Sequence, residues 1–226
     1  MKTVCLFDID GTLLNSGGAG QQAMELALAE VFGMHGPYTD IPAAGRTDWA
    51  ITRDLFAFHK LQVHDEDWRK FLDSYLQHLP ASLSQKEGVV LPGVPELLNQ
   101  LSARDEMVLG LLTGNVELGA RLKLRHFEID HHFPFGGFGD RHHNRDDVAR
   151  LALSAAVDYL MHEVHADRLW VIGDTPADIR CGRAIGAKVM AVATGIHPLE
   201  ELQPHQADDL RESLADVEDV VRILTS

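Results

Sequence analysis

Two aspartates separated by one residue follow the first apolar run of the chain. Asp8 and Asp10 stand in DIDGTLL, directly after TVCLF, which has the composition of a buried strand. Two carboxylates at the exit of a strand can point into one cleft, and Gly11 permits a tight approach of the backbone there. Such a pair can hold a hard divalent cation, or can divide the roles of nucleophile and acid/base. The alternative is that the two aspartates form an Asx-turn at the end of the strand and have no catalytic role.

Polar residues also follow two later apolar runs. Thr113, Gly114 and Asn115 come after VLGLL and offer a hydroxyl and backbone N–H donors for phosphate oxygens. Asp174 and Asp178 follow LWVI at the start of a helical pattern. A turn before a helix would explain the first group, and complementation of a helix dipole would explain the second. Four carboxylates after two strands instead favour a metal site that, with a hydroxyl and a cation, is typical of phosphoryl transfer.

Any phosphate-binding site in this chain needs a local source of positive charge. The 226 residues carry a formal net charge of -14, so the average surface repels phosphate. A metal ion or a few cations in a cleft must therefore make the site positive. A basic candidate lies in the segment Arg141 to Arg145, just before a helical pattern that begins at Asp146.

Alternation of apolar runs with helical patterns places these residues on a parallel sheet. The expected strands are Thr3 to Phe7, Met107 to Leu112, Leu169 to Ile172 and Lys188 to Ala193. The expected helices between them are Gly93 to Ala103, Val116 to His126, Asp146 to His162 and Thr175 to Ile185. Strands that alternate with helices imply right-handed crossovers and helices on both faces of the sheet. Ligands of such sheets bind beyond the carboxyl ends of the strands, where the polar residues fall.

The stretch between the first strand and Pro92 has helical patterns and no convincing strand. The expected helices are Gly18 to Met34, Thr47 to Leu61 and Glu66 to Leu79. We therefore predict a core domain of residues 1–15 and 87–226 and an inserted helical subdomain of residues 16–86. Asn15 to Gly20 and Ser82 to Gly88 are its expected hinges, which would let it act as a lid.

Composition excludes several classes of function. Hydrophobic residues make up 45% of the chain and charged residues 24%, as in ordinary globular proteins. The negative net charge argues against nucleic-acid binding. No apolar run is long enough to span a membrane. Two widely spaced cysteines indicate no disulfide framework, so we expect a cytoplasmic location. The 13 histidines are interpreted as solvated loop residues, and the acidic end DDLRESLADVEDVV as an exposed helix face.

DIDGTLL, LLTGN and IGDTPADIRCG, in this order and spacing, resemble the haloacid dehalogenase superfamily. The resemblance covers nearly the whole chain. It implies an α/β fold, a Rossmann-like parallel sheet flanked by helices, with an inserted α-helical cap domain. GRTD, which contains Arg46, resembles a cap segment near the substrate of phosphoglycolate phosphatase-like members, although an exposed loop is the favoured explanation for Arg46.

The resemblance also implies roles for the site residues. Asp8 would attack phosphorus to form an aspartyl-phosphate, and Asp10 would protonate the leaving alcohol and later deprotonate water. Mg²⁺ would sit on the Asp8 carboxylate, the Asp10 backbone carbonyl and Asp174, while Asp178 orients that shell or binds the metal through water. Thr113 to Asn115 and a cation would hold the phosphoryl oxygens. Many members have Lys followed by Pro at the cation's place; here Arg145 is the first candidate and Arg141 the second.

We therefore expect a magnesium-dependent phosphatase that acts on a small phosphorylated metabolite, with phosphoglycolate as the leading candidate. A sugar-phosphate mutase would share the nucleophile, but would need the cap to exclude water. A non-catalytic binding protein is the third hypothesis, against which the presence of all four motif carboxylates argues. The sequence indicates no oligomeric state.

Overall fold

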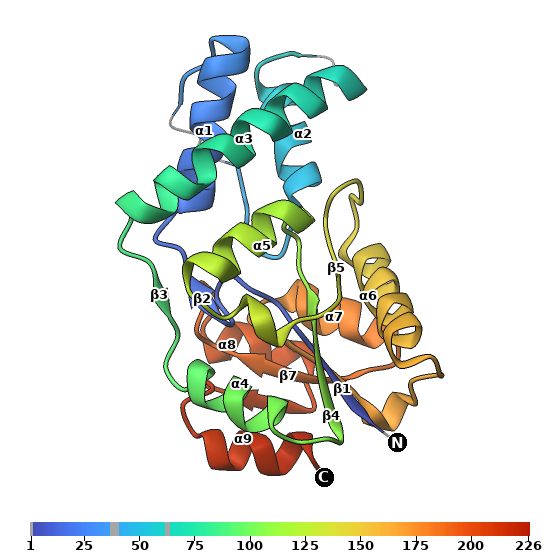
Figure 1. The fold of residues 1–226 in the computed structure, drawn as a ribbon. Helices are drawn as coiled ribbons and strands as arrows, with labels where there is room; N and C mark the ends of the chain where they lie inside the picture. The colour runs from blue at the N-terminus through green and yellow to red at the C-terminus, as the bar shows by residue number, and fades with distance from the viewer. Residues whose placement is uncertain (1, 37–40, 62–63) are drawn as a thin grey trace.

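The computed structural model describes residues 2–36, 41–61 and 64–226, and its centre is a parallel β-sheet (Figure 1). In spatial order the strands of this sheet are β5 (Gly136–Gly137), β4 (Met107–Leu112), β1 (Thr3–Phe7), β6 (Leu169–Gly173), β7 (Lys188–Val192) and β8 (Asp209–Arg211). The four inner strands confirm those predicted, and the sheet confirms the α/β class. The two short edge strands were not predicted.

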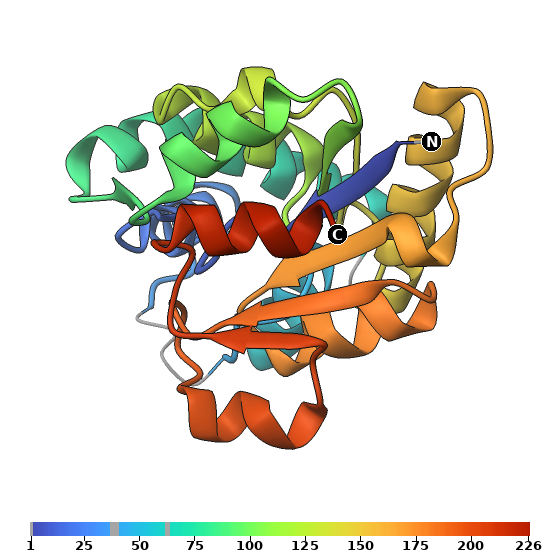
Figure 2. The same cartoon turned by 90° about the horizontal axis from the view of Figure 1, so that it is seen from below.

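Helices cover both faces of the sheet (Figure 2). One face carries α4 (Val94–Ser102), α5 (Glu117–His126) and α9 (Val217–Leu224). The other face carries α6 (Arg145–Leu160), α7 (Pro176–Ala184) and α8 (Leu199–Leu202). Successive side chains of a strand point to opposite faces, so Cys5 and Phe7 join the first core while Val4 and Leu6 join the second. Burial on both sides explains why the strand sequences are continuously apolar.

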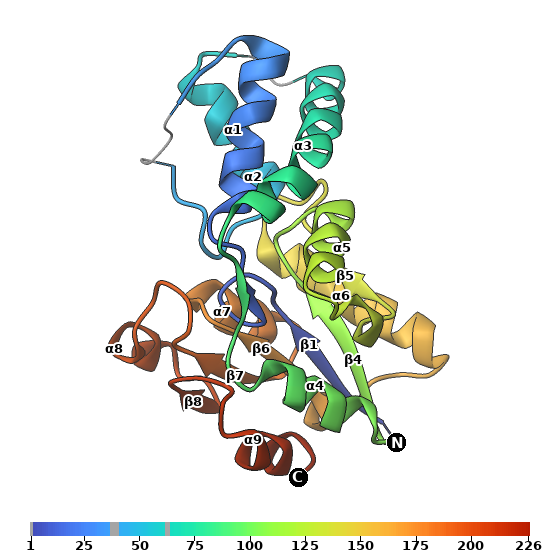
Figure 3. The same cartoon turned by 60° about the vertical axis from the view of Figure 1, so that its left-hand side comes forward.

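A third group of helices stands beyond the carboxyl ends of the strands, and the chain termini lie toward the opposite end (Figures 1 and 3). It consists of α1 (Ala19–Phe32), α2 (Asp48–Phe58) and α3 (Asp65–Gln85). These helices have an apolar core of their own that includes Leu28, Phe56 and Phe71. All three fall within residues 16–86, of which 37–40 and 62–63 lie outside the described residues. We refer to α1–α3 as the helical layer; the exact domain boundaries stay a prediction.

The two connections to the helical layer run side by side. Strands β2 (Leu14–Asn15) and β3 (Val89–Val90) pair antiparallel in a two-stranded sheet. The expectation of no strand between the first strand and Pro92 is therefore wrong, because two-residue strands leave no pattern in the sequence. The predicted end of the third helix at Leu79 is wrong, because α3 continues through Pro80 to Gln85, so most of the predicted second hinge is helical. The helix continues because buried Leu83, four residues after Leu79, extends the same apolar face.

Short turns of 3-10 helix complete the fold. They are Asp130–His132, Ala166–Arg168 and Gln203–His205. Among the described helices, none combines the length and the hydrophobicity that crossing a bilayer requires.

Packing of α1 can be tested with two leucines of the same helix. Leu28 is fully buried, whereas Leu26 is 41% exposed. Leu28→Ala should lower the free energy of unfolding by about 2–5 kcal/mol, because it removes buried methyl groups and leaves a cavity. Leu26→Ala should cost less than about 1 kcal/mol. Urea denaturation measures both, and equal losses would contradict the orientation of α1.

Candidate active site

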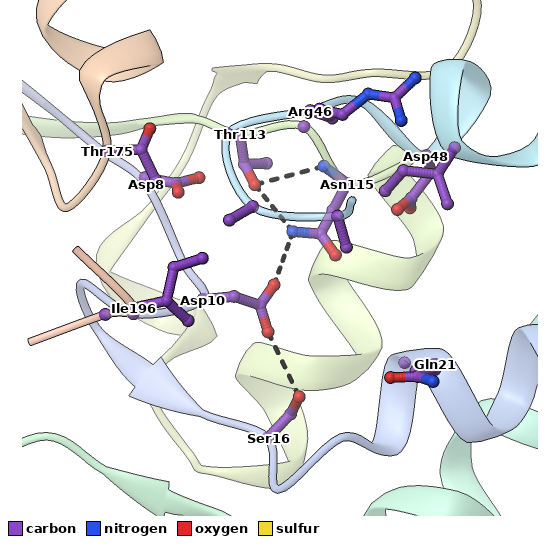
Figure 4. A pocket seen from close by; sticks show the side chains of 18 of the residues that line it. Asp8, Asp10, Ser16, Gln21, Arg46, Asp48, Thr113, Asn115, Thr175 and Ile196 are labelled. Atoms are coloured by element: carbon purple, nitrogen blue, oxygen red, sulfur yellow. Dashed lines mark hydrogen bonds between the residues drawn. The ribbon is translucent and has the colours of Figure 1, made fainter. Parts of the chain in front are cut away.

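A cavity of about 450 Å³ lies between the carboxyl ends of the strands and the helical layer. Its volume is within the range of small-molecule sites, which is roughly 300–1,000 Å³. The sheet side of its wall includes Asp8, Asp10 and Asp174, and the helical layer contributes Met24 and Leu55. The labelled side chains of this cavity are shown in Figure 4. Substrate held here would touch both parts of the molecule.

Three buried aspartates meet at the floor of this region. One carboxylate oxygen each of Asp8, Asp174 and Asp178 lies within 4.8 Å of the others. The adjacent strands β1 and β6 bring them together, because Phe7 is in register with Ile172 and the Asp8 N–H donates to the Ile172 carbonyl at 2.9 Å. Within the described part of the chain, no histidine belongs to a comparable cluster of potential ligands. Carboxylates from two segments that are distant in the sequence therefore share one site.

Arg145, and not Arg141, lies at this cluster. Its guanidinium is buried 3.5 Å from Asp8 Oδ1 and donates a hydrogen bond to Asp178, whereas Arg141 is exposed. Burial would lower the pKa of Arg145, but the nearby carboxylates of Asp178 and Asp8 outweigh it and raise that pKa. Asn144 positions the arginine, since its side chain caps α6 by accepting from the Asp146 N–H at 3.0 Å.

One guanidinium does not neutralise three carboxylates. Burial, together with the charges of Asp178 and Asp10, raises the pKa of Asp8 to about 7, although Arg145 opposes the shift. Burial and the charges of Asp178 and Asp8 raise the pKa of Asp174 to about 8. The ionised cluster is therefore unfavourable without further positive charge.

The donor set suits a hard divalent cation. Carboxylate oxygens are the ligands that Mg²⁺ prefers, and Asp8 and Asp174 each keep oxygen that protein donors do not saturate. Space around Asp174 depends on two glycines, because a Cβ at Gly11 or Gly195 would lie 2.4 or 1.8 Å from Asp174 Oδ2. Asp178 is more fully engaged, since it accepts from both the backbone and hydroxyl of Thr175 and from Arg145. The role of Asp178 in orienting the cluster stays a prediction.

Asp10 has a different environment from that of Asp8. Its carboxylate accepts from Lys123 Nζ at 2.6 Å, Asn115 Nδ2 at 2.9 Å and Ser16 Oγ at 3.3 Å (Figure 4 shows the last two). Burial would raise the pKa of Asp10, but the ion pair with Lys123 and these hydrogen bonds lower it overall. Lys123 was not predicted from the sequence, because it belongs to no motif. It reaches Asp10 because α5 starts directly after the loop of Asn115.

The loop after β4 connects the sheet to the helical layer. Thr113 is fully buried, and its hydroxyl accepts from the Asn115 side chain at 2.8 Å. The Gly114 carbonyl accepts from the Asp48 N–H at 2.8 Å, and the Asp48 carboxylate accepts from the Val116 N–H at 2.8 Å. A side chain at Gly114 would collide with the Arg46 carbonyl, 1.9 Å from the Cβ position. Glycine is therefore required where the two parts touch.

Arg46 lies in the cavity wall, but its guanidinium points away from Asp8 and Asp10 (Figure 4). It donates to the carbonyls of Pro42 and Ala50, and it pairs with Asp54 at 2.6 Å. The structure does not bring this cation to the aspartate cluster.

The electrostatic strain of the cluster predicts a stabilising substitution. The raised pKa values of Asp8 and Asp174 mean that the folded protein binds more protons than the unfolded chain between about pH 4 and pH 8. Their contribution to stability therefore falls as pH rises through this window. Without metal, Asp174→Asn should raise the free energy of unfolding at pH 8 by on the order of 1–3 kcal/mol, and less at pH 5.

Urea denaturation in EDTA at the two pH values measures this effect, with the exposed Asp105→Asn as the control. Mg²⁺ should then raise the Tm of the wild type and of the control, but not that of Asp174→Asn, because a ligand of the folded state stabilises it. An equal rise in all three proteins would contradict a metal site at Asp174.

Comparison with known proteins agrees with this geometry. A protein-family model described as haloacid dehalogenase-like hydrolase matches residues 5–192. The fold resembles that of a hydrolase from Pseudomonas syringae, with a TM-score of 0.75, 21% identity and coverage of 100% of both chains.

Two further solved structures have similar folds. One is described as a predicted phosphoglycolate phosphatase from Haemophilus somnus (TM-score 0.74, 18% identity, 97% of this chain and 98% of that one). The other is CbbY from Rhodobacter sphaeroides in complex with phosphate (TM-score 0.73, 19% identity, 96% of each chain). A search of curated proteins found no match.

Proposed function

Because this chain belongs to the haloacid dehalogenase-like hydrolase family, we propose that it is a magnesium-dependent phosphatase with Asp8 as covalent nucleophile. The observation that carries the proposal is the meeting of Asp8, Asp174 and Asp178 with Arg145 beside a cavity of substrate size. The substrate class is a small phosphomonoester.

In the first step the Asp8 carboxylate attacks phosphorus, and the bond from phosphorus to the leaving oxygen breaks. The product is an aspartyl-phosphate, an acyl phosphate that water hydrolyses in the second step. Asp8 suits this role because it lines the cavity next to the cation Arg145. Arg145 and the Thr113 to Asn115 loop are proposed to bind the phosphoryl oxygens, as backbone and charged donors do in other phosphoryl-transfer sites.

Asp8, Asp174 and the backbone carbonyl of Asp10 would hold Mg²⁺, and Asp178 would orient this shell. When bound, Mg²⁺ supplies positive charge that reduces repulsion between the nucleophile and the phosphate. Asp10 is proposed to donate a proton to the leaving alcohol and to accept one from the attacking water. Its hydrogen bonds to Ser16 and Asn115 fix its carboxylate at the cavity wall.

The helical layer would select the leaving group, because it forms the outer wall of the cavity. Phosphoglycolate was predicted from the resemblance of the cap and of GRTD, and within GRTD the guanidinium of Arg46 pairs with Asp54. A cytoplasmic location fits the two cysteines, which are buried as free thiols.

Asp8→Asn tests the nucleophile. Phosphate release from a panel of small phosphomonoesters with Mg²⁺ should fall by at least about 10³-fold, because the amide cannot form the acyl phosphate. Removing metal with EDTA should abolish the wild-type activity, and added Mg²⁺ should restore it. A wild type that is inactive on the whole panel would refute the proposal.

Asp10→Asn tests the division of roles between the two aspartates. The variant keeps the nucleophile but lacks the base for hydrolysis of the acyl phosphate. With a substrate that has a good leaving group, such as an aryl phosphate, it should accumulate phosphoenzyme with one added phosphoryl group by mass spectrometry. Asp8→Asn serves as the control that cannot be labelled, and labelling of both variants would reassign the nucleophile.

A further inference from the structure

Tyr75 of α3 carries a buried polar group that the fold does not use. The side chain lines the cavity, yet the residue is only 1% exposed and its hydroxyl has no hydrogen-bond partner within the described residues. The hydroxyl lies near Gly119 of α5, where a Cβ would be 3.3 Å away. A buried hydroxyl without a partner is costly, so a ligand group that bonds to it gains affinity.

The cations of the cavity wall are already paired. Lys123 is 2.6 Å from Asp10, Arg145 contacts Asp8 and Asp178, and Arg46 pairs with Asp54. The carboxylates of the wall are more numerous than its cations, and they are Asp8, Asp10, Glu25, Asp48 and Asp174. A carboxylate on the leaving group would add like charge to this wall without finding a free cation among the described residues.

The outer part of the cavity is apolar where the helical layer forms it. Met24 of α1 and Ile51 and Leu55 of α2 belong to the buried core of that layer and also face the cavity. On the opposite side Ile196 lines the cavity and is otherwise 74% exposed. Hydrocarbon placed between these residues would be removed from water.

Resting on the phosphatase activity proposed above, we propose that the leaving group is an uncharged alcohol with a hydrocarbon part and a second hydroxyl. The hydrocarbon part packs on Met24, Ile51 and Leu55, and the hydroxyl bonds to the Tyr75 hydroxyl. Tyr75 is thus a specificity residue, and the preferred substrate class excludes phosphoglycolate.

Three phosphomonoesters with the same number of carbon atoms separate the alternatives: butyl phosphate, ω-hydroxybutyl phosphate and ω-carboxypropyl phosphate. With Mg²⁺, kcat/KM should be highest for the hydroxybutyl ester and at least about tenfold lower for the carboxypropyl ester, because a charge in an apolar, acidic cavity is unfavourable. Phosphoglycolate should behave like the carboxypropyl ester.

Tyr75→Phe should lower the ratio of kcat/KM for the hydroxybutyl ester to that for the butyl ester by about five- to tenfold, mainly through KM. Ser82→Ala is the matched control, because it also removes a buried hydroxyl without a partner from α3, at a position outside the cavity wall. The control should keep the wild-type ratio. An unchanged ratio in Tyr75→Phe would overturn the assignment of Tyr75.

Preference for the carboxypropyl ester would overturn the proposed substrate class while leaving the phosphatase activity intact. If Lys123→Met then selectively lost activity on the carboxypropyl ester, Lys123 would be the residue that binds the leaving group, in place of Tyr75. Failure to hydrolyse any ester would instead refute the phosphatase activity itself.

Discussion

The repulsion among Asp8, Asp174 and Asp178 is the constraint on which the rest of the site depends. One oxygen of each carboxylate lies within 4.8 Å of the others, and burial of the three residues reduces screening by water. Arg145 offsets part of this cost, and Thr175 offsets more by donating to Asp178 through a capping box at the start of α7. The sheet holds the three groups together because β1 and β6 are adjacent and their hydrophobic burial stabilises that pairing. Core packing therefore sustains an arrangement that favours binding a cation.

The same loop that presents Thr113 also fixes the helical layer. Asp48 at the start of α2 bonds through its backbone to Gly114 and through its carboxylate to the Val116 N–H. Thr47, the N-cap of α2, donates its hydroxyl to the His142 carbonyl at 2.6 Å, in the loop before Arg145. The contact between the two parts of the chain thus touches the segments that carry the proposed phosphate-binding residues. A movement of the helical layer would therefore act on these residues through direct hydrogen bonds.

The local pattern of apolar and polar residues was sufficient to predict the inner strands and the polar residues at their ends. A strand buried on both faces must be apolar throughout and must end where polar residues begin. The local pattern was insufficient where contacts between distant segments determine the burial or the role of a residue. The acidic C-terminal segment, expected as an exposed helix, contains edge strand β8 and helix α9, whose Val220 and Leu224 are fully buried. Lys123 and Tyr75 sit in ordinary helical sequence, and only the approach of α3 and α5 to the cavity gives them a partner or a role. No spacing rule links them to Asp10.

The two proposed catalytic aspartates have different environments, which shift their pKa values in opposite directions. Asp8, with a pKa of about 7, is partly protonated at neutral pH, whereas the ion pair with Lys123 keeps Asp10 ionised. Catalysis by the proposed route requires the reverse, an ionised nucleophile and a protonated acid. Positive charge arriving beside Asp8 lowers its pKa, and a dianionic phosphoryl group near Asp10 raises the pKa of that acid and competes for Lys123. The reactive protonation state would then be assembled by the metal ion and the phosphoryl group together.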